Sequence, residues 1–244
     1  MSRAEKQLRR KRRKQRKYGR SYWDDRIISD FNVDVPPGLR LVEYDITHDP
    51  LESPEERDPD LEAAIGDRRQ ELFDRVHNDA RSAIPELESL LERFPNSRML
   101  MNWLSAAYQR IGDHEKSDSM VKLCHQRHPD YLFARTNLAA IHLQNGDTAQ
   151  ADAVMQHKWD LKLMYPHRDV FHVTEFTAMS YVAIDYFMQT GNRDAAELIL
   201  DAMVKLAPDH EATKSLQKGM YGSLLTKFLD RLSRRSRRNL RPAR

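Results

Sequence analysis

Apolar residues recur at helical spacing through the middle of the chain, and glycine or proline interrupts them at regular intervals. In residues 98–131, Met101, Leu104 and Tyr108 follow the three- and four-residue spacing of one helix face. A second stripe includes Val121, and Gly112 stands between the two stripes, where the first helix must end. This stretch therefore predicts two short antiparallel helices that bury their stripes against each other.

The same hairpin pattern returns along the chain. We expect copies near residues 64–97, 98–131, 132–176 and 177–210, followed by a capping helix at 211–232. The third copy carries an insertion, for which the pattern predicts a second helix lengthened to about Met164, a turn, and a new helix from about Val170. Because one hairpin cannot bury its apolar face alone, the copies must stack.

The best copy resembles a tetratricopeptide (TPR) repeat, whose pattern is W-x2-L-G-x2-Y, then A-x3-F, then P. The corresponding residues here are Met101-x2-Leu104-Ser105-x2-Tyr108, then Ser117-x3-Val121, then Pro129. The resemblance covers roughly residues 61–232. It implies an all-α, TPR-like α-solenoid of about four helical hairpins with a C-terminal capping helix.

The resemblance also implies a binding groove, because the first helices of successive TPR hairpins line a concave surface. It places six candidate residues there: Asn102, Gln109, Phe133, Asn137, Tyr181 and Asp185. Asparagine side chains can bond to the backbone of an extended peptide, and aromatic rings can hold apolar anchors. Chaperone-binding TPR domains hold a C-terminal carboxylate with a clamp of Lys, Asn and Arg. Only Asn137 matches that clamp, so the sequence argues against this subfamily.

Charge is concentrated at the two ends of the chain. Residues 1–20 hold eleven Lys or Arg and one Glu, and residues 227–244 hold eight Lys or Arg and one Asp, whereas residues 21–226 carry a net charge of −14. We expect a flexible basic N-terminal arm at 1–23 and a basic tail at 233–244. The candidate polyanion-binding residues are Arg9, Arg10, Lys11, Arg12, Arg13, Lys14, Arg234, Arg235, Arg237 and Arg238.

A proline-containing acidic linker at residues 24–60 separates the arm from the helical region at 61–232. Its small apolar clusters allow two interpretations. The segment either lies along the surface of its own repeats, as a peptide ligand would, or forms a short packed strand or turn within a linker.

No pattern of catalytic residues stands out, and we predict a protein that is not an enzyme and needs no cofactor or metal. Walker, dinucleotide, nucleophile-elbow and zinc-protease motifs are absent from the sequence. Cys124-His125-x2-His128 has metal-like spacing, but Cys124 occupies a repeat position that should be buried. The single cysteine fits a reducing compartment. No secretory signal or membrane-spanning run is evident, so we expect a cytoplasmic protein, or a nuclear one in a eukaryote.

Three functions remain open from the sequence. The first is an adaptor that binds a protein segment in the groove. The second is an RNA- or ribosome-associated protein held by its basic arms, and the third is attachment to an anionic membrane through the C-terminal basic helix. The sequence predicts no oligomeric state.

Overall fold

The computed structural model describes residues 36, 38–39, 44–49 and 59–219, and these residues are mostly helical. The predicted arms, the end of the predicted capping helix and all ten candidate polyanion-binding residues lie outside the described residues. The helices of the first half are α3 (Pro59–Ile65), the 3-10 turn η2 (Gly66–Arg68), α4 (Arg69–Asn78), α5 (Ala80–Arg93), α6 (Arg98–Ile111) and α7 (His114–Arg127). The second half contains α8 (Leu132–Gln144), α9 (Thr148–Val154), α10 (Leu161–Met164), α11 (Val173–Gln189) and α12 (Arg193–Leu206), and residues 211–219 are also helical.

Short capping sequences set the ends of α6 and α7. The Ser97 side chain accepts a hydrogen bond from the backbone N–H of Leu100 and so satisfies a donor in the first turn of α6. Gly112 ends α6 with a φ of 82°, a left-handed conformation that glycine adopts without strain. The Asp113 side chain then accepts from the backbone N–H of Lys116 and begins α7. Residues 98–127 therefore form two helices, as their apolar spacing predicts.

Small residues let α6 and α7 approach closely. Ser105 and Ser117 are both buried, and the Ser117 hydroxyl donates to the backbone carbonyl of Ser105 at 3.0 Å. This bond satisfies a buried hydroxyl that would otherwise be costly. The larger side chains of the two apolar stripes are also buried: Met101, Leu104, Tyr108, Val121 and Cys124.

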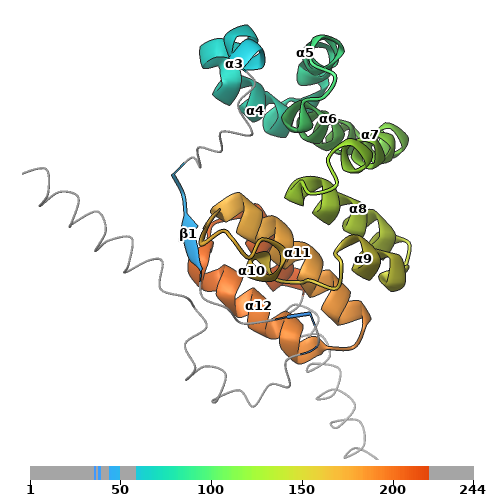
Figure 1. The fold of residues 1–244 in the computed structure, drawn as a ribbon, viewed down its shortest axis with the longest axis vertical. Helices are drawn as coiled ribbons and strands as arrows, with labels where there is room; N and C mark the ends of the chain where they lie inside the picture. Colours follow the sequence, from blue (N-terminus) through green and yellow to red (C-terminus); the bar gives the residue numbers. More distant parts are fainter. Residues whose placement is uncertain (1–35, 37, 40–43, 50–58, 220–244) are drawn as a thin grey trace, which may run out of the picture.

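Successive helices pack against one another along the chain. α4 contacts α5 and α6, α5 contacts α6, α7 contacts α8, and α8 contacts both α9 and α11, which in turn contacts α12. Figure 1 shows these helices following one another along an arc, from α3 and α4 at one end to α11 and α12 at the other. The arc is curved enough to bring Arg110, near the end of α6, close to Glu211 at the start of the last helical segment. The distance from Arg110 Nη2 to Glu211 Oε2 is 3.9 Å.

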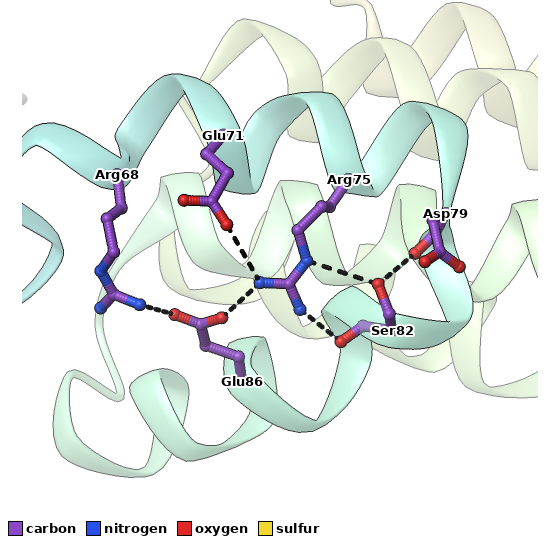
Figure 2. A network of polar contacts seen from close by, with 6 residues as sticks. All are labelled: Arg68, Glu71, Arg75, Asp79, Ser82 and Glu86. Carbon is purple, nitrogen blue, oxygen red and sulfur yellow. Dashed lines mark hydrogen bonds and ion pairs between the residues drawn. The ribbon is translucent and has the colours of Figure 1, made fainter.

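Polar contacts join η2 and α4 to α5 (Figure 2). Glu86 on α5 accepts hydrogen bonds from Arg68 at 2.8 Å and from Arg75 at 2.7 Å. Arg75 also donates to the side chain and the backbone carbonyl of Ser82. Glu71 lies farther from Arg75, at 4.0 Å. Arg75 therefore has the most contacts in the network, and Glu86 is the carboxylate on α5 that binds both arginines.

The inserted stretch differs from the sequence prediction. α9 ends at Val154 instead of continuing to Met164, and the chain turns through Gln156 and His157, both with positive φ. A helix would carry the indole of Trp159 along its own surface, whereas here the indole is buried, stacks on Tyr186 at 4.1 Å and donates to Asp152 at 2.8 Å. Tertiary contacts of the indole thus accompany the break in the helix.

A short strand also occupies the position predicted for the start of the next helix. β2 (Val170–His172) pairs in parallel with β1 (Asp45–Thr47), and α11 begins only at Val173. His172 begins α11 with a capping box, in which Glu175 accepts from the His172 backbone N–H at 2.9 Å. The all-α prediction did not include this pair of strands.

The described part of residues 36–49, which we call the N-terminal strap, lies on the inserted stretch. The backbone N–H of Trp159 donates to the carbonyl of Gly38 at 2.8 Å, and the Tyr44 ring meets Phe171 edge-on at 5.2 Å. Leu39 is buried in the same apolar cluster as Trp159 and Phe171. A side chain on Gly38 would collide with the carbonyl oxygen of His157, so the strap fits closely.

Candidate binding face

The six predicted groove residues lie in pairs on three helices. Asn102 and Gln109 belong to α6, Phe133 and Asn137 to α8, and Tyr181 and Asp185 to α11. Every one of them is exposed or half-buried. They lie outside the apolar clusters, so a ligand does not have to disrupt the core to reach them.

Two of the predicted asparagines contact each other across the arc. Asn137 Nδ2 on α8 donates to Asn102 Oδ1 on α6 at 3.0 Å. A primary amide has two N–H donors and a carbonyl oxygen with two lone pairs, so this bond leaves the Asn102 amide group and the Asn137 carbonyl oxygen available. Together these groups offer two N–H donors and one carbonyl acceptor, and the backbone of an extended peptide needs partners of both kinds.

α11 contributes an exposed patch with an acidic centre. Tyr181 is 44% exposed and Met188 is 38% exposed, and apart from Val170 they are the only large apolar side chains exposed to this degree among the described residues. Because they are seven residues apart on one helix, they lie on the same side of α11, two turns apart. Asp185, half-buried, lies on that side between them.

Gln189 connects this patch to α8. Its Nε2 atom donates to Asp185 Oδ1 at 3.0 Å and to the backbone carbonyl of Leu143 at 3.1 Å. Leu143 belongs to the last turn of α8, where helical carbonyls lack partners within the helix. The two bonds fix the Asp185 carboxylate next to the C-terminus of α8. Together we call Asn102, Asn137, Tyr181, Asp185 and Met188 the binding face.

The other two predicted residues have local contacts. Gln109 lies near the α6–α7 turn, where its side-chain oxygen is 3.2 Å from His114 Nδ1. The Phe133 ring contacts Tyr131 edge-on at 5.5 Å. The sequence prediction did not include Gln189, although its spacing of four residues from Asp185 on one helix was a signal for that contact.

The strongest pKa shifts occur away from the binding face, at residues with structural contacts. Burial raises the pKa of the Cys124 thiol to about 11, which keeps it protonated at neutral pH. Burial likewise raises the pKa of Asp160 to about 7, although the backbone N–H groups of Lys162 and Leu163 donate to its carboxyl oxygen and oppose the shift. Through these bonds Asp160 caps α10.

Within residues 59–219 and the short described pieces before them, no group of three or more His, Cys, Asp or Glu side chains is placed to hold a metal ion. In the same residues, no helix is both long and apolar enough to cross a lipid bilayer. No protein-family model, no curated protein and no solved structure matches the chain.

Proposed function

We propose that this protein is a non-catalytic adaptor of the TPR type that binds an extended segment of another protein on its binding face. The observation that carries the proposal is the bonded pair of Asn102 and Asn137, which joins two helices of the arc and offers both a donor and an acceptor. An extended segment needs such groups because its backbone N–H and C=O lose water on binding.

The repeat interpretation is supported by burial and by turn geometry. The TPR-like positions in α6 and α7 are buried, and Ser105 and Ser117 meet where those helices approach closely. Gly112 and Gly191 both have a φ of 82° at the turns of two different helix pairs. A recurring turn between paired helices is the local feature that such repeats share.

The direction of curvature supports a ligand on this side of the arc. Arg110 on α6 reaches Glu211, which follows α12 in the chain. α6 therefore lies on the inner side of the curve, and Asn137 on α8 contacts that same helix. A concave surface allows one extended ligand to contact several helices at once. Tyr181 and Met188 then supply the apolar anchors that give most of the affinity in such interfaces.

The test begins with peptides selected from a random displayed library against the full-length protein. Their dissociation constants are measured by fluorescence anisotropy for wild type, Tyr181→Ala and Asn137→Ala. We expect each variant to bind about tenfold more weakly or worse, because each removes an anchor or a backbone partner.

Gln126→Ala provides the control, because Gln126 is exposed on α7. Circular dichroism melting curves establish that the variants fold. Selected peptides that bind Tyr181→Ala and Asn137→Ala as tightly as wild type would show that the ligand lies elsewhere, and the proposal would then be wrong.

The charge distribution supports a second candidate function, in which the basic ends bind a polyanion such as RNA. Residues 1–20 carry eleven Lys or Arg against one Glu. Binding through about eight phosphate contacts should weaken by several orders of magnitude between about 50 and 200 mM salt. Deletion of residues 1–20 with no change in RNA retention would count against this function.

A further inference from the structure

We propose that the binding face takes a lysine or arginine side chain of the bound segment, held by Asp185 beside Tyr181. This inference rests on the proposed function and specifies the chemistry of its partner, namely a segment in which a basic residue is flanked by apolar ones. The clamp of chaperone-binding TPR domains has the opposite polarity, since it uses basic side chains to hold a carboxylate.

The first argument is the pairing of Asp185. Its carboxylate accepts from the neutral amide of Gln189, and no Lys, Arg or His of the described residues lies within ion-pair distance of it. Two other half-buried carboxylates have arginine partners: Glu86 pairs with Arg68 and Arg75, and Glu175 pairs with Arg168 at 2.7 Å. Asp185 differs from these two in having only a neutral amide beside it, so its negative charge can pair with a cation of the ligand.

The second argument is the position of Asp185 at the end of α8. Gln189 bonds to the Leu143 carbonyl and to Asp185 at once, which places the carboxylate next to the last turn of that helix. The C-terminus of a helix carries partial negative charge and favours nearby cations. The carboxylate and the helix end thus attract the same sign of charge, and an acidic or phosphorylated ligand would be repelled by both.

The third argument is the surroundings of the carboxylate on α11. Tyr181 lies one turn before Asp185 and Met188 one turn after it, and both are well exposed. A lysine or arginine side chain has an aliphatic stem that packs on apolar groups and a charged end that binds carboxylates and aromatic faces. Residues next to that cation in the ligand would lie over Tyr181 and Met188, which favours apolar side chains there.

The experiment compares peptide selections on three full-length proteins: wild type, Asp185→Lys and Asp194→Lys. Asp194 is exposed on α12, so its substitution changes the net charge equally without touching the binding face. We expect lysine and arginine, flanked by apolar residues, to be enriched on wild type and on Asp194→Lys. On Asp185→Lys the enrichment should change to aspartate and glutamate.

A double-mutant cycle then locates the contact. Replacing the basic residue of a selected peptide by norleucine should weaken its binding to wild type about tenfold, as expected for a charged hydrogen bond. On Asp185→Asn the same replacement should have little effect, because the partner carboxylate is already absent.

The two proposals fail in different ways. Peptides that lose affinity on Tyr181→Ala but show no basic enrichment, or that bind Asp185→Asn as tightly as wild type, would overturn the cation site and leave the adaptor function standing. Peptides that ignore Tyr181→Ala and Asn137→Ala would overturn the adaptor function itself. Basic enrichment that persists on Asp185→Lys would also overturn the cation site, since it would arise from another acidic part of the protein.

Discussion

Asp160 is both a buried carboxyl and the cap of a short helix, and the two features have opposite effects on its pKa. In the sequence it stands within a stretch that the apolar spacing assigns to a long helix. In the structure it precedes α10, is 5% exposed, and lies near the phenol of Tyr44 from the strap. Burial disfavours the charged carboxylate, whereas the two backbone donors favour it, and burial has the larger effect.

The raised pKa of Asp160 predicts a pH-dependent contribution to stability. Its pKa is about 7 in the folded protein, against an ordinary value of 3.8. Between these values the folded state holds a proton that the unfolded state releases, so this residue makes the fold less stable as the pH rises from about 4 to about 7. Above about pH 7 the loss is complete and constant.

Asp160→Asn tests this prediction, because asparagine still accepts hydrogen bonds from Lys162 and Leu163 but carries no charge. The measurement is the free energy of urea unfolding at several pH values. The stability of the variant relative to wild type should rise by about 1.4 kcal/mol per pH unit between about pH 4.5 and 7. A difference that stays constant over this range would contradict a buried, proton-binding carboxyl at residue 160.

The sequence pattern predicted the helices correctly where each segment buries a single apolar face. α6 and α7 follow their stripes because Ser97, Gly112 and Asp113 supply the ends that the pattern implies. The inserted stretch was predicted wrongly, because Gln156 and His157 carry no sequence signal for a left-handed turn. Their conformation accompanies contacts of the buried Trp159 with residues distant in the chain, which periodicity does not report.

The junction of α4 and α5 depends on one carboxylate more than on its neighbours. Glu86→Gln should lower the free energy of unfolding by about 1 kcal/mol, because Glu86 bonds to both Arg68 and Arg75 from a partly buried position. Glu71→Gln should change it by less than about 0.5 kcal/mol, since its oxygen is 4.0 Å from Arg75 and its side chain is 63% exposed. Chemical denaturation of the two variants checks the difference, and equal effects would contradict a larger contribution from Glu86 than from Glu71.

For the whole molecule, the sequence predicted the residue types of the candidate site better than their contacts. The resemblance to TPR repeats singled out Asn102, Asn137, Tyr181 and Asp185, and each of them is exposed or half-buried in the structure. The bond between the two asparagines depends on how one helix pair is set against the next, which no local pattern encodes. The strap shows the same limit, since its strand pairs with residues more than a hundred positions away.

The strap should act as a ligand of its own chain. We expect that cutting the backbone between residues 50 and 58, at an introduced site for a specific protease, makes docking of the strap bimolecular. The melting temperature of the cut protein should then rise with protein concentration, because the fragment that carries Leu39 and Tyr44 binds only the folded state. The same protein before cutting provides the control, and its melting temperature should not depend on concentration.

A melting temperature that is unchanged by cutting, and independent of concentration, would mean that the strap contributes nothing to stability. The buried position of Leu39 argues against that result, since burial of a leucine side chain stabilises by roughly 2 kcal/mol.

The strap also limits how this architecture can grow. β1 contacts α11 at one end of the arc, while α3 begins the other end, and only ten residue steps separate Asp49 from Pro59. Extended backbone covers roughly 35 Å over that length. An added helix pair would move the two ends apart by about 10 Å, the usual spacing of packed helices. A stack of helices with two free ends can gain a pair without further change. Here a duplicated pair would also require a longer connection between Asp49 and Pro59. The number of helix pairs and the length of this connection must therefore evolve together.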